Sequence, residues 1–172
     1  MKKFFKEERI MRKHAMIWPV LITIAVLLYG CGQLPDERLM EKGKRMEENE
    51  RFEEAVACYM ELDEKYPDSP HRAEALYHAG RVYSYGMNDF KEAIEMFQKV
   101  SNGYPDSNMA AQSQFMIGFI YANSLQDTAN ARVAYHRFLE KYPEHELVPS
   151  VQWELENLGK DINEIPVLKN IQ

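Results

Sequence analysis

The sequence predicts an all-α fold, an α-solenoid of three helix-turn-helix repeats followed by a C-terminal capping helix. The main observation is a segment that occurs three times at intervals of 38 residues, beginning at Phe52, Phe90 and Thr128: FEEAVACYMELDEKYP, FKEAIEMFQKVSNGYP and TANARVAYHRFLEKYP. Each copy has a small residue, a ring and a closing Tyr-Pro pair at the same positions. Self-similarity at a fixed period of about 20–50 residues is typical of stacked repeat arrays.

Each of these segments is interpreted as the second helix of a repeat. Its Tyr-Pro pair ends it, because the residue before a proline avoids the helical conformation. A first helix precedes each one, at about residues 35–48, 70–85 and 108–124. In the second repeat, Ser69 and Asp89 are the expected N-caps of the two helices. Gly86 is expected to end the first helix in the left-handed conformation.

A seventh helix is predicted at 147–158, where Trp153 continues the spacing of Tyr77 and Phe115. No second helix is predicted after it, so it resembles the polar cap that a repeat array needs. The expected organisation is therefore a segment 31–34 before the array, a repeat domain at 35–158 and a tail at 159–172. The repeats fall at about 35–69, 70–107 and 108–145, with the cap at 146–158.

Composition indicates a globular chain with an acidic body. The whole chain has a net charge of −6, and residues 31–172 contain 15 Lys and Arg against 25 Asp and Glu. This balance argues against a nucleic-acid partner, which requires clustered basic residues. The two cysteines, Cys31 and Cys58, are too few for a disulfide framework.

The N-terminus predicts a secretory signal at residues 1–30. Basic residues precede an uncharged apolar run from Ala15 to Gly30, which is the usual arrangement of such signals. Translation starting at Met11 instead of Met1 gives a more compact signal. The alternative is an uncleaved membrane helix, but the run is short for the ~20 apolar residues that a spanning helix needs.

The end of this run, Leu28-Tyr29-Gly30-Cys31, resembles the lipobox of bacterial lipoproteins. Leu28, Gly30 and Cys31 match that motif, while Tyr29 stands where a small residue is usual. The resemblance implies cleavage before Cys31, acyl chains on its sulfur and amine, and sorting to the outer membrane. Several acyl chains suit a stable anchor, since one chain alone holds only marginally.

The repeats resemble tetratricopeptide repeats, although the period is longer than the 34 residues of that family and its usual Trp near the repeat start is absent. In the family, small residues let the paired helices approach closely and rings fill the space beyond. The residues that match this packing pattern in the second repeat are Gly80, Tyr83, Ala93, Phe97 and Pro105. In the third repeat they are Gly118, Tyr121, Ala131, Tyr135 and Pro143.

The resemblance also implies that the first helices line a concave groove that takes a peptide or protein partner. The groove is expected to be aromatic at one end and acidic toward the N-terminus, where Glu47 and Glu48 lie. Tyr77, Phe115 and Trp153 either contact the partner or pack between helices, whereas Arg81 and Phe119 are expected to be exposed. The candidate partner-groove residues are Tyr77, Arg81, Tyr85, Phe115, Phe119 and Trp153.

The sequence contains no recognisable catalytic or metal-ligating pattern. It has no Gly-rich phosphate loop, and His71 and His78 are too far apart on one helix to share a metal directly. The acidic residues from Glu47 to Glu54 are interpreted as a solvated face, and Cys58 as a small packing residue. We therefore expect no enzymatic activity, cofactor, metal or small-molecule substrate.

The lipobox and the Tyr-Pro-Asp-Ser junctions together resemble the lipoprotein of the outer-membrane barrel-assembly machinery. That resemblance implies a lipid-anchored protein-binding scaffold at the periplasmic face of the outer membrane, with partners in the cell envelope. The repeats are also similar to the periplasmic partner of the Tol-Pal system, a cell-wall-linked adaptor. A self-assembling structural lipoprotein is a further alternative, in which the tail at 160–172 joins copies of the chain.

Overall fold

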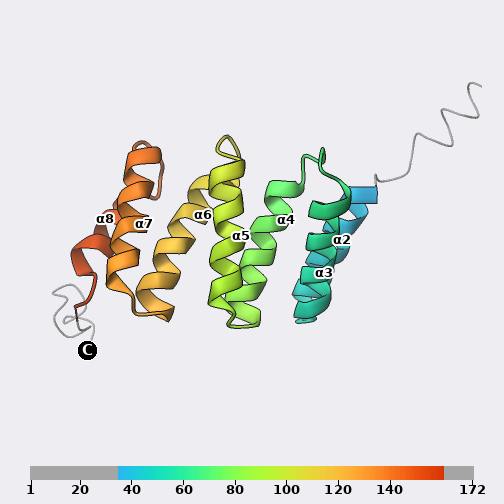
Figure 1. The fold of residues 1–172 in the computed structure, drawn as a ribbon, viewed down its shortest axis with the longest axis horizontal. Coiled ribbons are helices and arrows are strands. Elements are labelled where there is room, and N and C mark those ends of the chain that lie inside the picture. Colours follow the sequence, from blue (N-terminus) through green and yellow to red (C-terminus); the bar gives the residue numbers. More distant parts are fainter. Residues whose placement is uncertain (1–34, 161–172) are drawn as a thin grey trace, which may run out of the picture. The chain divides into compact units, whose positions relative to one another are not determined.

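A computed structural model describes residues 35–160, which form the predicted all-α repeat array (Figure 1). This part of the chain contains seven α-helices, two short π-helical turns and no strand. The elements in chain order are α2 (Pro35–Glu48), α3 (Phe52–Lys65), α4 (Arg72–Arg81), η1 (Val82–Gly86), α5 (Phe90–Gly103), α6 (Asn108–Phe119), η2 (Ile120–Ser124), α7 (Thr128–Lys141) and α8 (Val148–Asn157).

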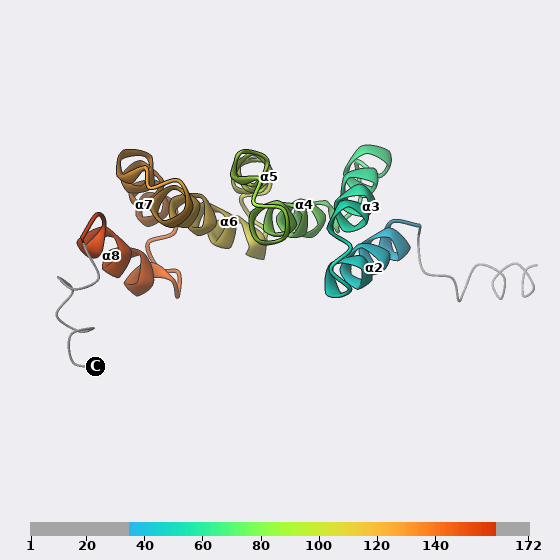
Figure 2. The ribbon, with the colours of Figure 1, turned by 90° about the horizontal axis from the view of Figure 1, so that it is seen from below.

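The helices of the repeat array lie in two layers. Figure 2 shows α2, α4, α6 and α8 on one side, here called the inner layer, and α3, α5 and α7 on the other, the outer layer. From α3 onward, each helix packs against the next one in the chain. This alternation is the arrangement that tandem helix-turn-helix repeats adopt to build a continuous core from neighbouring units.

Rings from the outer layer fill the space against small residues of the inner layer. Tyr59, Phe97 and Tyr135 are completely buried, as are Ala55, Ala93 and Ala131 on the same helices. The rings face Gly43, Gly80 and Gly118, where an added Cβ would meet ring atoms closer than real Cβ contacts allow. Close approach of the paired helices therefore depends on the absence of a side chain at these glycines.

Two features of the turns differ from the sequence-based expectation. The first helix of the second repeat begins at Arg72 rather than Pro70, and it ends in a π-helical turn, as does its counterpart in the third repeat. The left-handed residue is not Gly86 but Asn88, with φ 56°, and Glu50 and Gln126 occupy the same position in the other repeats. Gly86 instead leaves room for Phe52, whose ring a Cβ would approach to 2.6 Å.

Of the two expected N-caps, Asp89 is confirmed, whereas Ser69 lies ahead of the helix start and accepts a hydrogen bond from the His71 amide. The Asp89 side chain caps α5 by accepting a hydrogen bond from the Glu92 amide at 3.2 Å, and Asp127 caps α7 in the same way. The three Tyr-Pro pairs follow the ends of α3, α5 and α7. A side-chain oxygen at an N-cap satisfies one of the amides that a helix start leaves unpaired.

Gly118→Ala is expected to destabilise the array by about 1–3 kcal/mol through overpacking, reduced by about 0.5–1 kcal/mol of better helix propensity. The added Cβ would lie 2.5 Å from the Tyr135 ring, which is itself completely buried and has little freedom to move. Urea unfolding followed by circular dichroism measures the change.

Gly103→Ala is the matched control, because no atom lies within 4 Å of its added Cβ at the end of α5. This variant is expected to be neutral or slightly stabilised. Equal unfolding midpoints for the two alanine variants would contradict the close-packing role of Gly118.

Candidate protein-binding surface

The predicted groove residues all lie on the inner layer or its π-helical turns, but their exposure divides them into two groups. Tyr77 packs on Phe97 with ring centroids 5.6 Å apart, and Phe115 packs on Tyr135 at 6.1 Å. Both inner-layer rings are partly buried against the core clusters. The structure thus places Tyr77 and Phe115 mainly between the two layers.

Tyr85 and Trp153 are the exposed rings of this set. Tyr85 on η1 is 62% exposed, and its hydroxyl lies 3.9 Å from the sulfur of Met116 on the next inner helix. Trp153 on α8 is 42% exposed, because no described helix follows α8 to cover it as α7 covers Phe115. Phe119, expected to be exposed, is partly buried beside Phe115 at 6.0 Å.

Arg81 belongs to a polar cluster that joins α2, α3 and α4. Its Nη2 atom lies 3.6 Å from Oε1 of Glu47. The hydroxyl of Tyr59 donates to Oε2 of Glu47 at 2.8 Å, and Nδ1 of His78 lies 2.8 Å from the same oxygen. Beside this cluster, Lys44 pairs with Glu74 at 2.7 Å. At the end of the groove that was expected to be acidic, basic residues of the same chain therefore balance the charges of Glu47 and Glu74.

The burial of Glu47 corrects the interpretation of residues 47–54 as a solvated face, since its side chain is only 18% exposed. Burial raises the pKa of Glu47, but hydrogen bonds from His78 and Tyr59 and the charge of Arg81 outweigh it, so this pKa lies below its ordinary value. Burial and the hydrogen bond to Glu47 raise the pKa of Tyr59. The carboxylate therefore stays ionised and the phenol stays protonated at neutral pH.

Glu47→Ala is expected to destabilise the chain by about 1–3 kcal/mol at neutral pH, because it leaves the completely buried Tyr59 without its hydrogen-bond acceptor. The pKa of Glu47 is lowered in the folded state from an ordinary value of 4.5. Its contribution is therefore present above about pH 4.5 and is lost as the pH falls through the lowered pKa. Urea unfolding at pH 7, 5 and 3 measures this difference.

Glu48→Ala is the control, because Glu48 is the neighbouring carboxylate and is exposed. Its effect is expected to stay within about 0.5 kcal/mol at every pH. A constant deficit of Glu47→Ala from pH 7 to pH 3 would argue against the ionised hydrogen-bonded carboxylate.

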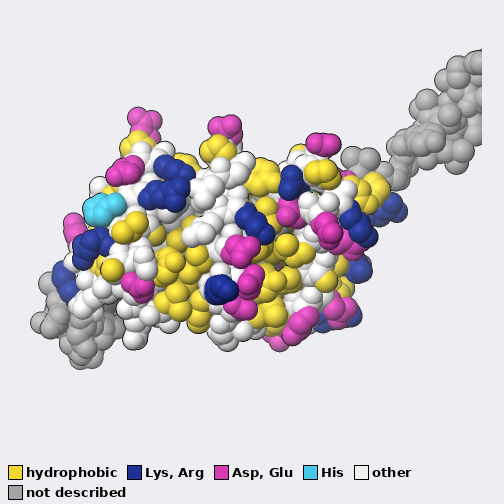
Figure 3. Space-filling model, in the orientation of Figure 1, with side chains coloured by type: hydrophobic (Ala, Val, Ile, Leu, Met, Phe, Trp, Pro, Cys, Tyr) yellow, Lys and Arg dark blue, Asp and Glu magenta, His cyan; other side chains and the backbone are white. Residues whose placement is uncertain are grey.

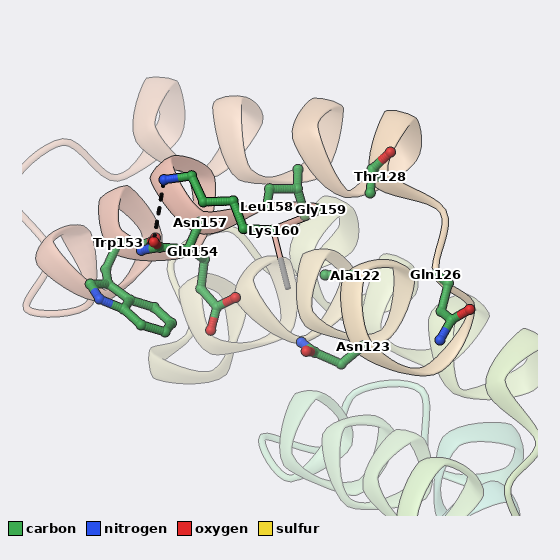
Figure 4. A pocket seen from close by; sticks show the side chains of 10 residues that line it. All are labelled: Ala122, Asn123, Gln126, Thr128, Trp153, Glu154, Asn157, Leu158, Gly159 and Lys160. Carbon is green, nitrogen blue, oxygen red and sulfur yellow. Dashed lines mark hydrogen bonds between the residues drawn. The ribbon is translucent and has the colours of Figure 1, made fainter. Parts of the chain in front are cut away.

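The Glu47 cluster lines one pocket of the inner layer. A second pocket lies near the other end of this layer, between η2 and α8 (Figure 4). It has a volume of about 510 Å³. The side chain of Glu154 points between the indole of Trp153 and the amide of Asn123. Asn157 accepts a hydrogen bond from Lys160 at 3.4 Å at the rim. The residues that line it are Ala122, Asn123, Gln126, Thr128, Trp153, Glu154, Asn157, Leu158, Gly159 and Lys160.

A further pocket of about 580 Å³ lies among α3, α4 and α5, beside the ion pair of Asp63 and Arg72. On the face shown in Figure 3, acidic and basic side chains are interspersed with apolar ones. Within residues 35–160, no group of three or more His, Cys, Asp or Glu side chains could hold a metal ion. Cys58 is buried, and burial raises the pKa of its thiol, which favours the unreactive protonated form.

Sequence reasoning placed Glu47 and Trp153 in the groove, but it missed the contacts of Glu47 with His78 and Arg81 and the role of Glu154 in the pocket beside Trp153. Both sites connect first helices of successive repeats, and Glu47 and His78 are 31 residues apart in the chain. The sequence could have predicted the contact between residues 47 and 78, because the 38-residue repeat places them on the first helices of two successive repeats. Their identities, a carboxylate and an imidazole, then indicate a polar pair.

Comparison with known protein families gives one match. Residues 72–153, from α4 into α8, match the family described as "YfiO: Outer membrane lipoprotein". The chain is therefore similar to outer-membrane lipoproteins over its second and third repeats and most of its last helix. No curated protein matches the chain.

Proposed function

We propose that this chain is a non-enzymatic protein-binding scaffold, held by acyl chains on Cys31 at the periplasmic face of the outer membrane, that serves envelope or outer-membrane protein assembly. The observation that carries the proposal is an inner layer that exposes Tyr85 and Trp153 on an otherwise well-packed repeat array. Exposed aromatic side chains are the residues that most often anchor protein partners. The similarity to outer-membrane lipoproteins supports the location.

The membrane anchor rests on the sequence, because Cys31 and the signal segment at 1–30 lie outside the described residues. No helix within residues 35–160 is long and apolar enough to cross a membrane. An acylated cysteine would supply the attachment by burying hydrocarbon at about 0.8 kcal/mol per CH₂. The first described helix begins at Pro35, so the proposed tether of residues 31–34 reaches at most about 14 Å.

Photocrosslinking in cells tests the proposal. A photoreactive residue at Tyr85 is expected to capture a component of the barrel-assembly machinery, because this side chain is the most exposed ring of the inner layer. Val133 on α7 is the matched control site, since it is 66% exposed but belongs to the outer layer. Mass spectrometry identifies the captured protein.

Three results would count against this function. Capture of wall-synthesis or envelope-constriction proteins at Tyr85 would replace the assembly role with the Tol-Pal-like adaptor role. Equal capture at Tyr85 and Val133 would mean that the inner layer is not a specific surface. A crosslink only to other copies of the chain would favour a self-assembling lipoprotein.

A further inference from the structure

The two inner-layer pockets occupy equivalent places in the first and third repeats. When 76, the length of two repeats, is added to the residue numbers of the Glu47 cluster, the result is the polar residues of the second pocket and the buried Tyr135 next to it. The first pocket is lined by Lys44, Glu47, Glu48, His78 and Arg81. The correspondences are Glu47 with Asn123, Tyr59 with Tyr135, His78 with Glu154, and Arg81 with Asn157.

In the first pocket, the chain supplies the positive charge that its carboxylate requires. Glu47 accepts a hydrogen bond from the Tyr59 hydroxyl. Its carboxylate oxygens lie 2.8 Å from Nδ1 of His78 and 3.6 Å from Nη2 of Arg81. A carboxylate removed from water is stable only when hydrogen bonds and opposite charge replace its hydration. This pocket therefore shows how the chain compensates a half-buried carboxylate that lies between two adjacent inner helices.

In the second pocket, the carboxylate lies on the opposite helix, because Asn123 stands at the position of Glu47, and no basic residue replaces Arg81. Glu154 now stands at the position of His78, and uncharged Asn157 stands at the position of Arg81. Glu154 forms no ion pair with any residue in the described range 35–160, and burial raises its pKa. Lys160, at the rim, directs its ammonium to Asn157 instead.

The hydroxyl of Tyr135 lies at the same site as Glu154. Tyr135 is completely buried, and its hydroxyl has no well-formed hydrogen bond with any described residue. Burial raises the pKa of this phenol, and the neighbouring Glu154 carboxylate raises it further. Its counterpart Tyr59 donates to a carboxylate that also contacts His78 and the Arg81 guanidinium. The Tyr135–Glu154 pair thus has the polar groups of the first cluster without its positive charge.

We infer that the pocket between η2 and α8 binds a basic side chain, lysine or arginine, presented by an extended segment of a protein partner. The cation would lie between the Glu154 carboxylate and the Trp153 indole, whose ring attracts cations through its face. Asn123 and Gln126, on the other side of the pocket, offer amide groups to the backbone of that segment. The inference rests on the proposed scaffold function. It adds that the C-terminal end of the repeat array recognises a positively charged side chain of the partner.

A partner, rather than Lys160, is assigned as the source of the cation because Lys160 already bonds Asn157 at the rim. The pocket also opens among inner-layer elements, η2 and α8, which belong to the same layer as the exposed Tyr85. A segment that lies along this layer can reach both places. The tail at 161–172, which contains Lys169, is the competing source and is tested separately.

Titration with acetyl-lysine methylamide tests the inference. The mature chain that begins at Cys31 contains Trp153 as its only tryptophan, and NMR follows the indole N–H and the Glu154 carboxyl carbon. We expect saturable shifts of both signals. We also expect the affinity for acetyl-lysine methylamide to fall at least about tenfold in Glu154→Gln, compared with the unsubstituted chain. Acetyl-norleucine methylamide, which has no charge, is expected to produce no saturable shift.

Glu156→Gln is the matched control, because it removes an exposed carboxylate from the same helix. It is expected to leave lysine binding unchanged, while thermal unfolding checks that both variants fold. Equal binding of the two probes, or equal loss in both variants, would overturn the inference. Binding that appears only after Lys169→Gln would assign the pocket to the chain's own tail and overturn the partner source.

Failure of this inference is distinguishable from failure of the proposed function. If the lysine probe does not bind but Tyr85 still captures an assembly component in cells, the scaffold function stands and the cation pocket does not. If the probe binds but the inner layer captures no envelope protein, the pocket chemistry stands and the assembly role does not.

Discussion

Phe97→Ala is expected to destabilise the repeat array by about 3–5 kcal/mol, which is a large share of the stability of an ordinary domain. Phe97 is completely buried, packs against Tyr77 with centroids 5.6 Å apart and fills the space left by Gly80. Removing its ring opens a cavity between α4 and α5 in the middle of the array. Urea unfolding monitored by circular dichroism gives the free-energy difference.

Val133→Ala provides the control for Phe97→Ala. It also removes apolar atoms from an outer-layer helix, but Val133 is 66% exposed, so the change is expected to stay within about 0.5 kcal/mol. A loss of less than about 1 kcal/mol for Phe97→Ala would mean that the ring is not the central contact between these helices.

Cys31→Ala is expected to move the protein from the membrane fraction or to leave it as an unprocessed precursor. The reason is chemical: alanine has no sulfur to receive a diacylglycerol, and the proposed anchor depends on the hydrocarbon of these acyl chains. Fractionation of cells and intact-mass measurement of the product follow both effects. Cys58→Ala is the control, since this buried cysteine belongs to the repeat core and its loss should leave membrane attachment intact.

Membrane retention of Cys31→Ala at an unchanged mature mass would refute acylation at this residue. Release of both cysteine variants would instead indicate that attachment depends on the folded array. The two cysteines thus separate anchoring through lipid from anchoring through a bound partner.

The repeat register was predictable because its signals are local. Helices α3, α5 and α7 begin at Phe52, Phe90 and Thr128, where the repeated segments begin. Proline and capping residues act within a few positions of themselves, so a single sequence shows them. Glu50 and Gln126 were not predictable as left-handed residues by residue type, because glycine and asparagine are the usual choices for that conformation.

The binding surface was predictable only in outline. The resemblance to known repeats indicated which helices face inward, but exposure depends on what covers each ring. Tyr77 and Phe115 each meet a ring of the next helix, whereas Trp153 has no such described partner. The pairing of Glu47 with His78 and Arg81 depends on the contact of α2 with α4, which can be inferred only after the repeat register has placed these helices side by side.

The contact pattern of the array has a mechanical consequence. Its helices touch mainly their nearest neighbours along the chain, so few contacts join distant segments. A pull applied through the two ends of such a structure separates one interface at a time, because no single contact set holds all repeats together. We expect a pulling force to unfold the array in steps of about one repeat, instead of unfolding all repeats in a single event.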